Sequence, residues 1–300
     1  MSFASDTKTA LCMIVPQSDC CAVAEFAAMA ALSQECTREK IVFITENEDA
    51  AYLFSGLALR CFDLASSPEV TEKKHMTALF FKTEISGEGW EKAFDALFPN
   101  GVCGLADFTE VCKSCEASFL RGAFIAAGFV NPPDKPYDIE FSTESADIAA
   151  DVATVLFRRF AMPKLTARKG KQIVYYHDAE VVADMLTLLG AKKSALEIMN
   201  SQAIRSIRNS ENRRANFEYA NISKMTAASA PQIEAINGLK RIGKFGNLPP
   251  QLQATANLRL ANPLAPLSEL CEMENPPVSK SQESKRLQRI VDFYGLHSQQ

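Results

Sequence analysis

The sequence predicts an α+β protein in which a pseudo-symmetric body of two similar units precedes an all-α domain. Between residues 19 and 189, the hydrophobic patterns of helices and strands follow one another in the same order twice, with a repeat of roughly 90 residues. After Leu189 the patterns are those of helices alone. We therefore expect three segments: 1–108, 109–205 and 206–300.

Each of the first two segments opens with a helix that is rich in small residues. In the first segment, helices are expected at 19–32, 50–62 and 89–98, and strands at 40–45 and 76–82. In the second, helices are expected at 112–128, 145–160 and 180–189, and strands at 137–141, 165–168 and 173–177. The small residues are Ala24, Ala27, Ala28 and Ala31 in one opening helix, and Gly122, Ala123, Ala126 and Ala127 in the other. Because small side chains let a second backbone come close, the two helices are predicted to pack against each other.

Charge is distributed unevenly along the chain. Residues 1–160 contain 13 Lys or Arg and 24 Asp or Glu, which gives this part a net charge of −11. Residues 161–300 contain 19 Lys or Arg and 12 Asp or Glu, a net charge of +7, so the whole chain carries −4. The basic part favours an acidic partner, and a polyanion such as nucleic acid fits best. There is no run of eighteen apolar residues and no signal-peptide pattern, so we expect a cytoplasmic protein without a membrane partner.

Two cysteine pairs are candidates for a zinc site. Cys20 and Cys21 are adjacent, and Cys112 and Cys115 form a CxxC motif. The histidines do not lie near either pair in the sequence, since they stand alone at His75, His177 and His297. We therefore expect buried thiols in a reducing compartment, with no metal site and no cofactor.

The segment from 206 to 236 combines cations with asparagines. Arg208, Arg213 and Arg214 stand among Asn209, Asn212, Asn216 and Asn221. Asparagine is a poor helix former, so its frequency here suggests that the amides have a role. Two interpretations stay open: a polar, solvated helix, or an element that contacts phosphates or bridges domains.

The last seventy residues predict a helix-turn-helix. Helical patterns at 248–263 and 266–273 precede a turn at 274–278 and a helix at 279–296. Ser279 and Gln282 are spaced for a capping box. One face of the last helix gathers Leu287, Ile290, Val291 and Tyr294, and the opposite face gathers Gln282, Lys285, Arg286 and Arg289. An apolar back with a basic front is typical of a recognition helix. The predicted DNA-contacting residues are Lys280, Ser281, Gln282, Lys285, Arg286 and Arg289, with Arg208, Arg213 and Arg214.

These segments together resemble the WhiA family of bacterial regulators. The residues that carry the resemblance are Phe119 to Phe124, the run Arg208-Asn209 with Asn212-Arg213, Asn216, Glu218, Ala220-Asn221 and Lys224, then Leu258-Arg259-Leu260 with Asn262-Pro263, and Pro276-Pro277 with Ser279-Lys280-Ser281 and Arg286-Leu287. The departures are Lys285, where the family usually has His, Pro266 in place of a small hydroxyl residue, and Phe129 in place of a small residue.

The resemblance implies a two-unit body like that of LAGLIDADG homing endonucleases, fused to a helix-turn-helix. It also implies binding to double-stranded DNA in the nucleoid, control of sporulation genes, and a role in cell division and chromosome segregation. Another transcription regulator or RNA polymerase is left open as a protein partner. By the motif register, the metal-binding acids of the nucleases are replaced by Ser33 and Ala127, so we expect no enzymatic activity. The alternative is a scaffold of the division machinery with incidental DNA affinity.

Overall fold

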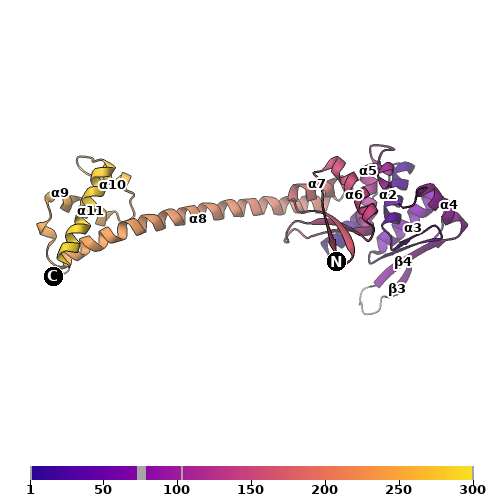
Figure 1. Ribbon diagram of the computed structural model, residues 1–300, viewed down its shortest axis with the longest axis horizontal. Helices are drawn as coiled ribbons and strands as arrows, with labels where there is room; N and C mark the ends of the chain where they lie inside the picture. Colours follow the sequence, from indigo (N-terminus) through magenta and orange to yellow (C-terminus); the bar gives the residue numbers. More distant parts are fainter. Residues whose placement is uncertain (1, 73–78, 103, 299–300) are drawn as a thin grey trace. The chain divides into compact units, whose positions relative to one another are not determined.

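The computed structural model describes residues 2–72, 79–102 and 104–298, and it divides into two compact units, residues 1–205 and 206–300. Figure 1 shows the order of the elements along the chain. His75 and the first residues of the strand predicted at 76–82 lie outside the described residues. No helix in the described ranges is both long and apolar enough to cross a bilayer.

The first unit contains the predicted repeat. After α1 (Phe3–Cys12), its first half consists of α2 (Asp19–Ala31), β1 (Glu35–Cys36), β2 (Lys40–Thr45), α3 (Glu48–Phe62), β3 (Glu69–Glu72), β4 (Leu79–Ser86) and α4 (Glu88–Leu97). After the 3-10 helix η1 (Leu105–Thr109), the second half consists of α5 (Cys115–Ala127), β5 (Gly128–Val130), β6 (Ile139–Thr143), α6 (Ala146–Arg159), β7 (Lys164–Arg168), β8 (Lys171–Tyr176) and α7 (Ala179–Leu189). The two sheets have the equivalent orders β1-β2-β4-β3 and β5-β6-β8-β7, with antiparallel pairing throughout. The α+β class and the repeat are thus confirmed.

Besides the 3-10 helix η1, four elements of this unit are absent from the sequence prediction. The strands β1, β3 and β5 have two, four and three residues, too few for an alternating pattern to stand out. The fourth is α1, where Thr7 is fully buried and bonds to the hydroxyl of Ser194 at 2.8 Å. Ala4 and Leu11 are the other buried residues of this helix, and two apolar positions are too few for a clear helical period.

The helices α2 and α5 pack side by side at the centre of this unit. A Cβ atom added to Gly122 would lie 2.3 Å from the backbone oxygen of Glu25. Arg121 donates a hydrogen bond through Nε to the Glu25 carboxylate at 2.9 Å, and both side chains are buried. The predicted close contact between the two small-residue helices is therefore confirmed, and a buried ion pair spans it.

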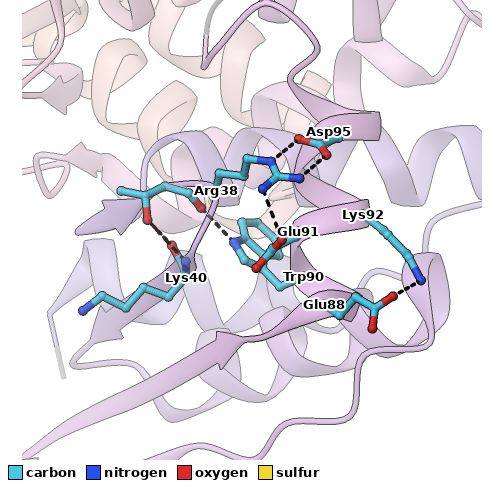
Figure 2. Close-up of polar contacts among 8 residues, drawn as sticks. Arg38, Lys40, Glu88, Trp90, Glu91, Lys92 and Asp95 are labelled. Atoms are coloured by element: carbon cyan, nitrogen blue, oxygen red, sulfur yellow. Dashed lines mark hydrogen bonds and ion pairs between the residues drawn. The ribbon is translucent and has the colours of Figure 1, made fainter.

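Polar contacts attach α4 to the hairpin of the first sheet (Figure 2). The Trp90 ring is fully buried, and its Nε1 donates to the carbonyl oxygen of Thr37 at 2.8 Å. Arg38 binds Asp95 through two hydrogen bonds of 2.9 Å and Glu91 through one of 3.1 Å. Because these ion pairs are exposed, the buried indole contributes more to the attachment than they do.

A single helix, α8 (Lys192–Arg241), extends from the first unit into the second. The sequence patterns predict a helix that ends at 189 and a separate element at 206–236, whereas that element is part of one helix of 50 residues. Its residues from Ser206 to Lys224 are all exposed. Without a buried face, this stretch shows no amphipathic period by which its extent could be predicted.

The second unit contains α8 from Ser206 onward and three further helices. They are α9 (Pro250–Ala261), α10 (Leu267–Met273) and α11 (Lys280–His297), with the 3-10 helix η2 (Phe245–Asn247) before α9. Its core contains Ile236, Leu239, Leu248, Leu252, Ala256, Leu270, Leu287 and Ile290. A Cβ atom on Gly238 would lie 2.2 Å from the Tyr294 ring, so α8 and α11 touch closely here. The predicted all-α domain is confirmed.

Candidate nucleic-acid interface

The helix α11 is anchored by its apolar side. Leu287 and Ile290 are buried in the core of the second unit, and Tyr294 packs against it, as does Phe293, which the sequence analysis did not select. At the start of the helix, the Ser279 hydroxyl accepts from the backbone N–H of Gln282 at 3.3 Å, and the Gln282 side chain accepts from the Ser279 N–H at 3.2 Å. The predicted capping box is confirmed, and α11 therefore begins at a fixed residue.

Cations lie on the opposite side of α11. Lys280, Lys285 and Arg289 are exposed, and so is Ser281. Within the described ranges, none of these three cations forms an ion pair with an acidic side chain. Their charges therefore remain available to an external anion.

Gln282 lies on the exposed side as predicted, but part of its side chain is already engaged. Its oxygen is the acceptor of the capping box, so only the amide N–H groups are free to donate. Reading of adenine by glutamine uses the oxygen and the nitrogen together. The prediction that Gln282 contacts a base edge stays untested. Two-point reading of adenine would require the capping box to open, whereas donation by the free N–H groups would not.

Arg286 differs from its predicted place on the open face. Only 21% of its side chain is exposed, and its Nη1 lies 3.3 Å from the Glu274 carboxylate, which is buried. Glu274 also accepts a hydrogen bond from the buried hydroxyl of Thr255. Arg286 therefore joins α11 to the end of α10 and to α9, which the helical periodicity of α11 alone could not reveal.

Two further charged residues that the sequence analysis missed are buried beside Arg286. Glu283 is fully buried, and neither of its carboxylate oxygens has a hydrogen-bond partner among the described residues. Burial, followed by the charge of Glu274, raises the pKa of Glu283, whereas Arg286 and Arg259 lower it. Arg259 donates to the carbonyl oxygen of Ala265 at 2.8 Å. A polar cluster therefore lies beneath the candidate interface.

The predicted cations of α8 are exposed in the second unit. Arg208 and Arg213 are open to solvent, whereas Arg214 pairs with Glu218 at 3.1 Å. This pair spans one helical turn in solvent and holds Arg214 only weakly. The structure places all three residues on a solvated helix, and their contact with DNA stays a prediction.

The positions of the missing nuclease acids lie at the C-terminal ends of α2 and α5. The Ser33 hydroxyl donates to the carbonyl oxygen of Ala30 at 2.7 Å, and Ala127 is the last residue of α5. Among the described residues that line the cleft beside Ser33, the only carboxylate belongs to Glu144. Glu35 pairs with Lys40 at 2.9 Å. The cleft thus lacks the paired carboxylates that a two-sided metal site requires.

Comparisons with known proteins match both parts of this architecture. Residues 116–208 match the WhiA LAGLIDADG-like domain, and residues 212–294 match the WhiA C-terminal HTH domain. The "Probable cell division protein WhiA" of Heliobacterium modesticaldum is 32% identical over 313 aligned positions, which cover 100% of this chain and 98% of the relative. The protein of the same name from a Thermoanaerobacter species is 32% identical and covers 98% and 97% of the two chains.

A solved structure has the same fold over nearly the whole length. Full-length DUF199/WhiA of Thermotoga maritima superposes with a TM-score of 0.63 at 22% identity, and the match covers 98% of each chain. The fold and both domain matches agree with the resemblance that the sequence motifs predicted. With its helix-turn-helix domain and LAGLIDADG-like body, this chain belongs to the WhiA family.

Proposed function

We propose that the chain is a non-enzymatic regulator of transcription that binds double-stranded DNA through α11. The observation that carries this proposal is the arrangement of that helix, in which Leu287 and Ile290 are buried while Lys280, Lys285 and Arg289 are exposed and unpaired within the described ranges. In a helix-turn-helix, the N-terminal part of the second helix enters the major groove. Lys280, Ser281 and Lys285 would then lie nearest the bases, and Arg289 nearer the phosphates.

A titration of duplex DNA at several salt concentrations tests the proposal. The Lys285→Gln/Arg289→Gln double variant should reduce the slope of log affinity against log salt by roughly one, since the phosphate contact of Arg289 is lost, and should weaken binding further through the loss of Lys285 near the bases. A matched control is Lys92→Gln/Lys135→Gln, which removes two exposed cations from the first unit. Equal slopes for both variants and the unmodified protein would contradict a role of α11.

The competing function is a protein-interaction scaffold of the division machinery. The relatives named above carry "cell division" in their names, and the acidic first 160 residues suit a protein partner better than DNA. A scaffold would bind DNA weakly and with little salt dependence, so the same titration separates the two functions.

Crosslinking to DNA in cells, followed by sequencing, would identify the sites of a nucleoid-bound regulator of sporulation, division or chromosome segregation genes. Copurified RNA polymerase or a second regulator would identify its protein partner.

The absence of nuclease activity is the second part of the proposal. Ser33 and Ala127 supply no carboxylates, and a single acid such as Glu144 cannot hold a metal ion from both sides of the helix pair. Plasmid DNA should therefore stay supercoiled in the presence of Mg²⁺ or Mn²⁺. Nicking that persists through purification and disappears in Glu35→Gln or Glu144→Gln would show that cleavage has been retained.

A further inference from the structure

The two cysteine pairs of the sequence meet in the folded chain. The sulfur atoms of Cys20, Cys21, Cys112 and Cys115 all lie within 4.8 Å of one another. Cys112 Sγ is 3.6 Å from Cys21 Sγ and 3.4 Å from Cys115 Sγ, and all four cysteines are free thiols. The expectation of no metal site relied on the absence of a nearby histidine, but four thiolates need none.

We propose that Cys20, Cys21, Cys112 and Cys115 bind one structural zinc ion. With Zn–S bonds of about 2.3 Å, the sulfurs of a tetrahedral site lie ~3.8 Å apart, close to the separations seen here. An iron–sulfur cluster places several iron and sulfide atoms between its thiolates, so it would need a wider arrangement. The measured distances therefore favour a single tetrahedral ion.

Helix N-termini lie at three of the four sulfurs. Cys20 and Cys21 lie in the first turn of α2, and Cys115 is the first residue of α5, so positive helix ends face the sulfurs. A helix N-terminus favours negative charge, which zinc-bound thiolates carry.

Ser18 provides a second layer of contacts. It stands at the N-cap of α2, yet its side chain does not cap the helix. Its hydroxyl lies 3.1 Å from Cys20 Sγ and 3.1 Å from Cys21 Sγ. Hydrogen bonds of this kind hold metal-binding sulfurs in place and tune their charge.

The proposed ion would join the two halves of the first unit. One pair of ligands belongs to α2 and the other to the start of α5, and Cys21 and Cys112 are 91 residues apart in the sequence. The site lies at the N-terminal ends of these helices, whereas Ser33 and Ala127 lie at their C-terminal ends. It is thus distinct from the metal position of the nucleases.

Metal analysis of the full-length chain tests the proposal. Protein purified with a phosphine reductant and without chelators should contain one zinc per chain. After exchange, Co²⁺ should show the intense visible bands of tetrahedral thiolate coordination. Cys112→Ser/Cys115→Ser should weaken zinc binding more than about 100-fold, and Ser18→Ala roughly tenfold, because an outer contact matters less than a ligand. The matched control Cys36→Ser/Cys61→Ser removes two half-buried thiols from elsewhere in the unit and should bind zinc normally.

Alkylation of the unmodified protein keeps the test independent of variant folding. Bound zinc should protect the peptides that contain Cys20, Cys21, Cys112 and Cys115 from a maleimide, while Cys36 and Cys61 react at unchanged rates. Equal alkylation of the four cysteines with and without zinc, or equal zinc affinity in the double variant and the control, would overturn the proposal.

Discussion

Gly122 shows how one residue sets the distance between two helices. The 2.3 Å separation between its virtual Cβ and the Glu25 oxygen is shorter than real Cβ contacts allow, and the obstructing atom belongs to a backbone. Even Gly122→Ala should therefore lower the free energy of unfolding by about 1–3 kcal/mol, through the overpacking it causes. Chemical denaturation of the full-length chain measures this loss.

Gly56 provides the control for that prediction. It lies within α3, and no atom is found within 4 Å of its virtual Cβ. Gly56→Ala should stabilise the protein by up to about 1 kcal/mol, because alanine is the better helix former. Two glycine-to-alanine changes in one unit should thus have opposite signs. A neutral Gly122→Ala would mean that α2 and α5 are farther apart.

Glu283 makes the stability of the second unit depend on pH. Burial raises its pKa in the folded state, so the folded chain holds the proton to higher pH than the unfolded chain does. The contribution of Glu283 to the free energy of unfolding is therefore lost as the pH rises from its pKa in the unfolded chain, about 4.3, through its higher pKa in the folded chain. Glu283→Gln should raise the melting temperature at pH 7.5 and leave it nearly unchanged at pH 4. A lower melting temperature at pH 7.5 would show that attraction to Arg259 and Arg286 exceeds the cost of burial.

At the scale of one element, some features of α11 can be predicted from its own sequence, and others depend on the rest of the fold. Its start at Ser279, its buried side with Leu287 and Ile290, and its exposed Lys285 and Arg289 follow from local spacing. Those features depend on helix geometry alone. The places of Arg286 and Glu283 depend on Glu274, Arg259 and Thr255, which belong to other elements or to the turn between them. Periodicity within one helix carries no information about such partners.

This separation predicts different effects of two neighbouring arginines on α11. Arg286→Ala leaves the buried Glu274 without its cation and should destabilise the second unit by about 1–3 kcal/mol. Arg289→Ala, at an exposed site, should change stability by less than about 0.5 kcal/mol. Thermal unfolding followed by circular dichroism measures both. Equal melting temperatures for the two variants would place Arg286 in solvent, as the sequence analysis expected.

At the scale of the whole molecule, the sequence predicted the repeat because helix and strand patterns are local and recur. It could not predict that Cys20 and Cys21 would meet Cys112 and Cys115. That contact arises only when α2 and α5 align, and adjacent and CxxC cysteines give no sign of it separately. The extent of α8 was unpredictable for a different reason, since its exposed middle has no partner that would impose a period.

The division of the chain also makes a prediction about fragments. The second unit has a core of its own, formed between Ile236 and Ile290 and separate from that of the first unit. Residues 206–300 alone should therefore unfold cooperatively and show a helical circular dichroism spectrum. The fragment should bind DNA, but more weakly than the full chain if the first unit adds contacts. A fragment without helical signal would place the boundary elsewhere.

The ion pair between Glu25 and Arg121 has a consequence for the symmetry of the first unit. The acid comes from one half of the first unit and the base from the other, and both are buried at the contact. Two copies of the earlier half would face each other without an arginine, and two copies of the later half without a carboxylate, which leaves buried charge uncompensated. The two halves are thus complementary at this contact, not interchangeable. A symmetric dimer of either half through this contact would therefore bury two like charges.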